Sequence, residues 1–173
     1  MKIEKPGNYT VSDGEEVEVV GTGEGVVITM TGGEVWTCGK SAPVITMTGG
    51  TVRTFGSSAP VILQSRGYVS TWGSSTPFIN MTGGYVWTFD SSAPVIHQSG
   101  GEVMTWASST PFINMTGGEV STWVSSAPVI HQSGGEVRTF GSYAPIINQS
   151  GGDVWTLEKS APVIHQIKKR QTK

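Results

Sequence analysis

The stretch TPFINMTGGYVWTFDSSAPVIHQSGGEVMTWASS (residues 76–109) is followed directly by TPFINMTGGEVSTWVSSAPVIHQSGGEVRTFGSY (residues 110–143). The two 34-residue blocks differ at eight positions, and each block is itself two copies of a 17-residue unit. The same unit repeats without insertion or deletion from about residue 31 to residue 167. A fixed period of this length indicates a solenoid, in which each unit buries its apolar side only against its neighbours.

Two kinds of turn sequence punctuate every unit. A glycine pair such as Gly83-Gly84 alternates with Ser-Ala-Pro or Ser-Thr-Pro, and short segments such as 85–89 and 94–98 lie between them. These segments are rich in β-branched and aromatic residues, which favour strands. We expect each strand to pair in parallel with its copy in the next coil, about 4.8 Å away. The sequence therefore predicts an all-β fold, a single parallel β-solenoid (β-helix) of roughly 8–9 coils, with the right-handed coiling that is usual for parallel connections.

Two apolar columns recur in every coil, a valine on the first strand and an isoleucine on the second. We assign both columns to the interior; they comprise Val35, Val52, Val69, Val86, Val103, Val120, Val137 and Val154, and Ile28, Ile45, Ile62, Ile79, Ile96, Ile113, Ile130, Ile147 and Ile164. A threonine column from Thr37 to Thr156 is equally uniform. Strict alternation along a strand predicts that these threonines also face inward, with their hydroxyl groups hydrogen-bonded. An exposed threonine ladder is the alternative.

Length and composition indicate one domain with three parts. We assign residues 1–25, which depart from the repeat, to an N-terminal cap, residues 26–167 to the solenoid, and residues 168–173 to a basic C-terminal tail that protects the last strand edge. Charged residues are 14% of the chain and the net charge is −2, so a nucleic-acid partner is not expected.

Neither the cysteine count nor the N-terminus identifies a compartment. Cys38 is the only cysteine, so no intrachain disulfide can form. The sequence as given shows no signal peptide and no transmembrane segment, and we expect no membrane association. Localisation stays open.

The eight differences between the duplicated blocks all lie on the first strand or the corner that follows it. The second strand is identical in both blocks, including His97/His131 and Asn80/Asn114. This contrast predicts a binding face on the first strands, although a face that simply tolerates substitution would look the same. Its aromatic, Met and Arg content is typical of the residues that anchor protein and sugar contacts. The predicted face comprises Trp36, Arg53, Tyr68, Tyr85, Trp87, Met104, Arg138 and Trp155.

A further column directly after the threonines is apolar in every coil. Its aromatic members are Phe55, Trp72, Phe89, Trp106, Trp123 and Phe140. Packing into the core after a bend is one interpretation, and an outward stripe of rings on which sugars could stack is the other.

These repeats resemble the single-chain parallel β-helix group, which includes secreted pectate-lyase-like proteins, adhesins and insect ice-binding proteins. The resemblance covers most of the chain but no specific member, and the group hosts many functions. It implies ice binding where Thr-x-Thr ranks face outward, whereas the first strands here read Val-x-Thr. Recent tandem duplication and deliberate repeat design both fit the exact repetition.

No cluster in the sequence indicates catalysis. His97, His131 and His165 lie two coils apart, about 9.6 Å, which is too far for shared metal ligation. Glu102, Glu119, Glu136 and Asp153 form a ladder without the irregular loops that would enclose a substrate. We therefore predict no enzymatic activity, no cofactor and no metal.

The predicted function is a scaffold or binding module that presents the variable first-strand face. The alternatives are an ice-binding protein and a carbohydrate-binding or polysaccharide-acting β-helix. A protein or carbohydrate surface is the expected kind of partner, and end-to-end self-association is a further expectation because solenoid ends carry open strand edges.

Overall fold

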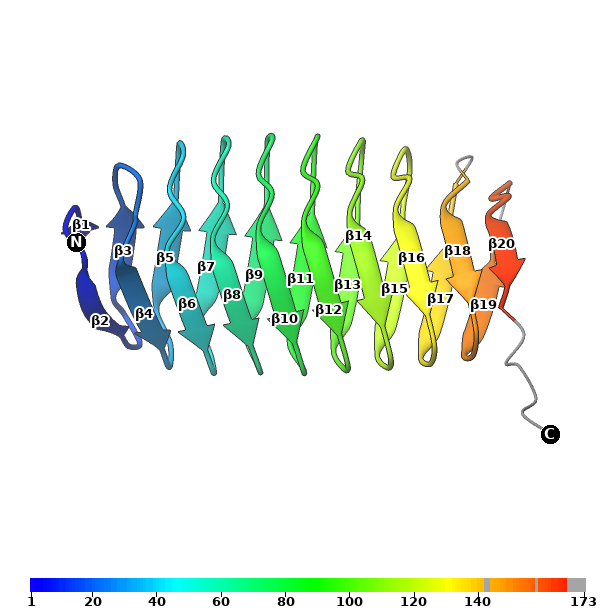
Figure 1. Cartoon of the computed structure of the whole chain (residues 1–173), viewed down its shortest axis with the longest axis horizontal. Helices are drawn as coiled ribbons and strands as arrows, with labels where there is room; N and C mark the ends of the chain where they lie inside the picture. Colours follow the sequence, from blue (N-terminus) through cyan, green and yellow to red (C-terminus); the bar gives the residue numbers. More distant parts are fainter. Residues whose placement is uncertain (142–143, 158, 168–173) are drawn as a thin grey trace.

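The computed structural model describes residues 1–141, 144–157 and 159–167, and it shows a parallel β-solenoid of ten coils. Successive coils lie side by side along the long axis, with β1 and β20 at opposite ends of the solenoid (Figure 1). Each coil gives one strand to each of two ten-stranded sheets. The all-β fold and its parallel pairing are confirmed.

The odd-numbered strands form the sheet that we call sheet A. They are β1 (Lys2–Ile3), β3 (Glu16–Val19), β5 (Glu34–Thr37), β7 (Thr51–Thr54), β9 (Tyr68–Thr71), β11 (Tyr85–Thr88), β13 (Glu102–Thr105), β15 (Glu119–Thr122), β17 (Glu136–Thr139) and β19 (Asp153–Thr156). The even-numbered strands form sheet B. They are β2 (Gly7–Val11), β4 (Val26–Met30), β6 (Val44–Met47), β8 (Val61–Gln64), β10 (Phe78–Met81), β12 (Val95–Gln98), β14 (Phe112–Met115), β16 (Val129–Gln132), β18 (Ile146–Gln149) and β20 (Val163–Gln166).

The coil count exceeds the predicted 8–9 because residues 1–25 contribute strands to both sheets. There Lys2 pairs with Glu18, Glu16 with Glu34 and Gly7 with Val26, so the sequence spacing of paired residues changes from one pair to the next. From β4 onward each strand pairs with the equivalent position of the next repeat, as Val27 does with Val44. A search for a fixed period therefore misses the first coils.

Four columns of side chains fill the space between the sheets. The valine and isoleucine columns are fully buried through most of the solenoid, and a column that mixes Met and Gln completes the sheet B side. The threonine column is also inward, with Thr37 to Thr139 at most 2% exposed. The prediction from strict alternation is therefore confirmed, and the exposed threonine ladder is excluded over these coils.

The buried threonine hydroxyls from Thr37 to Thr105 are each matched by a buried serine of the next coil. Thr71 Oγ1 donates a hydrogen bond to Ser92 Oγ at 3.0 Å, and the same contact joins Thr37 to Ser58 at 3.3 Å. All four of these side chains are 0% exposed. The Ser of the corner thus satisfies the Thr of the preceding coil, which explains why a polar pair lies in the core.

The two corners make different demands on the backbone. At the glycine pair, Gly50 has φ 83° and a Cβ there would lie 2.5 Å from the Gly32 carbonyl oxygen, so only glycine fits. At the other corner the residue after the aromatic column also has positive φ. Most coils use glycine there, but Asp90, Ala107 and Val124 adopt φ of 55°, 55° and 56°.

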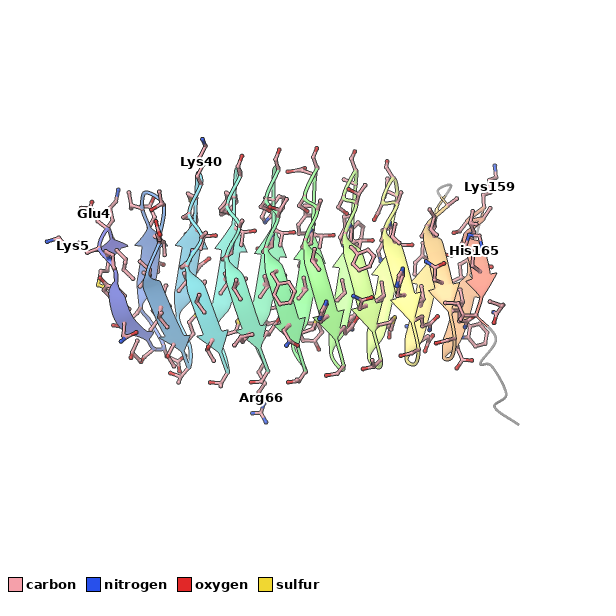
Figure 2. All side chains as sticks on the ribbon, in the orientation of Figure 1. Glu4, Lys5, Lys40, Arg66, Lys159 and His165 are labelled. Atoms are coloured by element: carbon pink, nitrogen blue, oxygen red, sulfur yellow. The ribbon has the colours of Figure 1, made fainter. Side chains whose placement is uncertain are left out.

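Charged side chains lie mainly away from the centre of sheet B. Figure 2 shows Lys40 and Lys159 at the corners along one edge of the solenoid and Arg66 at the opposite edge. The predicted basic tail, residues 168–173, lies outside the described residues, as does Tyr143. Within the described part of the chain, no helix is long and apolar enough to cross a membrane.

Candidate functional site

The outer surface of sheet A carries three columns of side chains, which we call together the aromatic face. Alternate residues of a strand point outward, so each strand contributes one residue to each of two columns. On β5 these residues are Glu34 in the first column and Trp36 in the second. The third column follows the strand end and begins at Cys38. All eight residues of the predicted binding face lie in the first two columns.

The predicted residues are accessible on this face. Tyr68 is 49% exposed, Tyr85 and Trp87 are each 40% exposed, and Trp36 and Trp155 are also exposed. Met104 lies in the same column as Trp87, one coil further on, and is half-buried.

The third column, which holds the predicted aromatic residues, lies on the outer side of the coil. Its rings are half-buried and do not belong to the buried core cluster. They stack on one another, with ring centroids 4.0 Å apart for Trp72 and Phe89 and 3.9 Å apart for Trp123 and Phe140. Core packing is therefore wrong for this column. The outward stripe is what the structure shows.

Five rings on adjacent strands β9 and β11 and the corners after them form one connected group, which we call the aromatic cluster. Its members are Tyr68, Trp72, Tyr85, Trp87 and Phe89. Tyr68 stacks on Tyr85 at 5.0 Å and meets Trp87 edge-on at 6.3 Å. Trp87 meets Phe89 edge-on at 6.4 Å, and Phe89 stacks on Trp72. The cluster therefore spans all three columns across two coils.

Arginine ion pairs lie on both sides of the aromatic cluster along the solenoid. On the N-terminal side, Arg53 pairs with Glu34 and its guanidinium lies 5.7 Å from the ring centroid of Trp36. On the C-terminal side, Arg138 Nε donates to Glu136 at 2.6 Å and Nη1 donates to Glu119 at 2.7 Å. The aromatic cluster thus has a charged arginine pair on each side of it along the face.

The acidic ladder borders an open hollow of about 420 Å³ beside the glycine corners, lined by Gly84, Tyr85, Gly101, Glu102, Gly118, Glu119 and Glu136. Burial raises the pKa of the Glu102 carboxyl, the Glu119 carboxylate raises it further, and Arg138 opposes both effects. Among the described residues, no three His, Cys, Asp or Glu side chains come together as a metal site would require.

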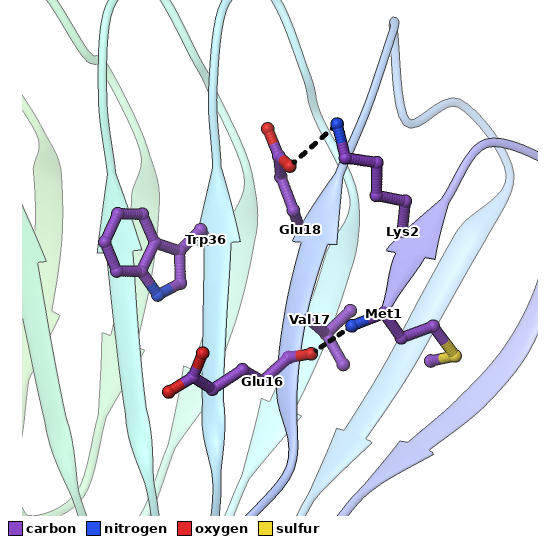
Figure 3. Close-up of a pocket in the computed structure, with 6 residues that line it drawn as sticks. All are labelled: Met1, Lys2, Glu16, Val17, Glu18 and Trp36. Carbon is purple, nitrogen blue, oxygen red and sulfur yellow. Dashed lines mark hydrogen bonds and ion pairs between the residues drawn. The ribbon is translucent and has the colours of Figure 1, made fainter.

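A second open hollow of about 370 Å³ lies where Trp36 meets the first strands (Figure 3). Lys2 Nζ lies 3.4 Å from Glu18 Oε2, and the Met1 ammonium donates to the Glu16 carbonyl oxygen at 2.6 Å. Glu18 is also the neighbour of Trp36 in the strand register. The N-terminal end of the aromatic face is therefore polar.

Comparison with protein-family models, curated proteins and solved structures finds no match for the chain. Its function must therefore be argued from the geometry of its own faces.

Sequence reasoning did not identify which rings touch. Tyr68 and Tyr85 occupy equivalent positions in neighbouring coils, so their stacking could have been read from the period. The link between the second and third columns could not, because the side-chain direction at the corner depends on the backbone after the strand ends.

Proposed function

We propose that the chain is a non-enzymatic binding module whose aromatic face contacts the surface of a partner protein. The observation that carries this proposal is the aromatic cluster, in which Tyr68, Tyr85 and Trp87 are 40–49% exposed. Tyr, Trp and Arg are the residue types that dominate binding energy at protein interfaces. An apolar centre with a polar rim is also the usual anatomy of such interfaces.

The size of the exposed area sets the strength of binding that the cluster supports. The three exposed rings offer roughly 300 Å² to a partner, taking about 150–250 Å² for a whole aromatic side chain. At about 25 cal/mol per Å² this is about 7 kcal/mol before costs, which is similar to the entropy lost on association. The flanking Arg53 and Arg138 must therefore contribute to any tight complex.

The ring geometry favours a protein over a sugar. A sugar ring stacks its C–H groups on an open aromatic face, which carries the negative side of the ring quadrupole. Here Tyr68 and Tyr85 are nearly parallel, with 12° between their planes, and each covers a face of the other. Trp72 and Phe89 cover each other in the same way, at 13°. One face of each of these rings is thereby covered, and the exposed edges that remain suit side chains and backbone carbonyl oxygens.

Two observations weigh against the alternative functions. The threonine rank on which ice binding would rest is buried, so it cannot meet an ice surface. Two carboxylates of the acidic ladder, Glu119 and Glu136, are held together by Arg138. One oxygen atom of each of these carboxylates is therefore engaged by the guanidinium rather than turned toward a substrate, which supports a binding role over polysaccharide cleavage.

Peptide selection on the whole chain tests the proposal. Peptides selected from a random displayed library should converge on the aromatic cluster, because affinity concentrates where exposed rings lose water. The double variant Tyr85→Ser/Trp87→Ser should weaken the selected peptides at least about tenfold. Trp155→Ser is the matched control, because it removes an exposed Trp of the same column outside the cluster. Peptides that ignore the double variant would contradict the proposal.

Two further measurements address the alternatives directly. Retardation in gels that contain soluble pectin, xylan or cellulose derivatives, abolished by Trp87→Ser, would reassign the face to carbohydrate. Thermal hysteresis of the freezing point would show ice binding. We expect neither.

A further inference from the structure

The outer surface of sheet B is uncharged over nearly the whole solenoid. From β4 to β20 its outward positions, and the residues directly before and after each strand, hold no Asp, Glu, Lys or Arg, all within the described residues. Their centre is a continuous column of apolar residues, which we call the Val/Phe column: Val27, Val44, Val61, Phe78, Val95, Phe112, Val129, Ile146 and Val163. Val95 and Phe78 are 37% and 38% exposed. A long apolar stripe without charges indicates a surface that is covered in the working molecule.

A second column on the same face carries hydrogen-bonding side chains. It alternates Asn80, His97, Asn114, His131, Asn148 and His165, in register along sheet B. Between residues 78 and 131 the two columns change in step. A coil that carries Phe and Asn is followed by a coil that carries Val and His. Phe78 meets His97 edge-on at 5.1 Å and Phe112 meets His131 at 5.0 Å. These contacts hold the large rings in fixed positions.

We propose that sheet B is the interface of a homodimer, in which a second copy of this chain packs face to face on it. The alternation of Phe and Val in successive coils indicates that the partner on this sheet is a second copy of the chain. Consider a two-fold axis that runs parallel to the strands and passes between the coils of Val95 and Phe112. The axis keeps each column opposite its own copy and reverses the order of the coils, so every Phe lies opposite a Val.

The pairing that results is complementary in both size and hydrogen bonding. Phe112 lies opposite Val95 of the second copy, and Phe78 opposite Val129. In the four central coils Asn114 lies opposite His97 and Asn80 opposite His131, so these two amides each meet an imidazole, whereas further out Asn148 lies opposite Leu63. A two-fold axis along the solenoid would instead place the Val/Phe column on the polar column, with Phe78 on Asn80. That arrangement buries amides against rings, which is unfavourable.

The area is sufficient for a stable dimer. With this axis eight coils of each copy overlap, a length of about 38 Å at 4.8 Å per coil. The outward residues span about 20 Å along the strand at 3.3 Å per residue. The product is roughly 760 Å² for each copy, or about 1,500 Å² in total, within the standard range for specific interfaces. Face-to-face packing of aligned sheets about 10 Å apart is common in β-sandwiches.

The internal duplication supports the same assignment. Between residues 76–109 and 110–143 all eight differences fall on sheet A strands and the corners after them, while the sheet B residues are identical. A surface that must match its own copy at several coils has less freedom to change than one that meets solvent or a variable partner. This inference does not depend on the function proposed for the aromatic face.

Sedimentation of the full chain from about 1 to 100 μM tests the proposal. The wild-type chain should sediment as a dimer, and Val95→Lys should shift the dissociation constant at least about 100-fold, because the two-fold axis places two buried charges in the interface. Met104→Lys is the matched control, since it puts the same charge on the opposite face, and it should remain dimeric. Circular dichroism and thermal unfolding confirm that both variants fold. A wild-type monomer at about 100 μM, or a dimer that tolerates Val95→Lys, would overturn the proposal.

A size exchange tests the register of the two copies. Val95→Phe should place Phe against Phe and Phe112→Val should leave a gap, so each change alone should weaken the dimer about tenfold or more. The double variant exchanges the large and small residues and should return the dissociation constant to within about threefold of wild type. Additive losses in the double variant would refute this axis. A monomer that shows thermal hysteresis, abolished by Val95→Lys, would assign the face to ice and refute the dimer.

Discussion

Ser41 and Ser58 occupy equivalent corners of neighbouring coils, yet replacing each with alanine should change stability in opposite directions. Both side chains are 0% exposed. Ser58 Oγ accepts a hydrogen bond from Thr37 Oγ1 at 3.3 Å, whereas Ser41 Oγ is buried without a partner. The reason lies one coil earlier, where Val19 takes the place of threonine in the strand register. Ser41 therefore carries the full cost of desolvating a hydroxyl group.

The magnitudes follow from this difference. An unsatisfied buried hydroxyl costs about 1–3 kcal/mol, so Ser41→Ala should raise the free energy of unfolding by about 1 kcal/mol. Ser58→Ala leaves Thr37 Oγ1 without its partner and should lower it by about 1–3 kcal/mol. Val19→Thr should supply the missing donor, and in that background Ser41→Ala should become destabilising.

Urea unfolding followed by circular dichroism measures these changes. Repeat proteins can unfold in parts, so the comparison holds only if the urea slopes of the variants agree. The assignment of the Thr–Ser pairs as the source of polar stability in the core would be refuted in either of two cases. Ser41→Ala and Ser58→Ala could change the free energy of unfolding in the same direction, or Ser41→Ala could remain stabilising in the Val19→Thr background.

Three further predictions concern single positions. Val124 has φ 56°, a left-handed conformation that costs about 1–2 kcal/mol for a residue with a Cβ. Val124→Gly should therefore raise the free energy of unfolding, but by less than about 1 kcal/mol, because glycine also gains freedom in the unfolded chain. A lower melting temperature for this variant would contradict the prediction. The raised pKa of Glu102 means that its contribution to stability is present below the ordinary glutamate pKa and is lost as pH rises through the folded value. Glu102→Gln should therefore stabilise the protein at pH 7 and have little effect near about pH 3 in denaturant titrations, and an equal effect at both pH values would argue against it. The pKa of the Cys38 thiol is raised, mainly by burial and further by the Glu18 carboxylate. Glu18→Gln should therefore increase the thiolate fraction and speed alkylation by iodoacetamide at about pH 8. An unchanged rate would show that the Glu18 charge does not act on the thiol.

The repeat period predicted most of the architecture because each coil meets the same environment as its neighbours. Alternation along a four-residue strand was enough to place the threonine column inside. The period failed for residues 1–25, where turns of different length change the sequence spacing between paired strands. The paired strands are nevertheless similar, since Val17 faces inward as Val35 does.

The two faces were harder to predict, for different reasons. On sheet A the third column follows the strand end, where alternation no longer fixes side-chain direction, so Trp72 and Phe89 could be assigned to the core or the surface. On sheet B the segment Val95-Ile96 offers two apolar neighbours. Only one of them can face inward. Because Ile96 is buried, Val95 lies on the uncharged outer surface of sheet B.

The contrast between a constant and a variable face has a single physical explanation if both proposals hold. A substitution on sheet B would be present in both copies of the dimer, so one substitution changes the interface twice. A substitution on the aromatic face changes one contact with one partner.

Packing sheet B against sheet B also leaves the two aromatic clusters on opposite outer surfaces of the dimer, where both can bind at once. A partner whose repeated sites are joined by a segment long enough to reach both outer surfaces would then be held far more tightly than by one cluster, because the second contact forms at high effective concentration. Val95→Lys should remove that gain while leaving the affinity for a single selected peptide unchanged, which separates the dimer from the aromatic face in one comparison.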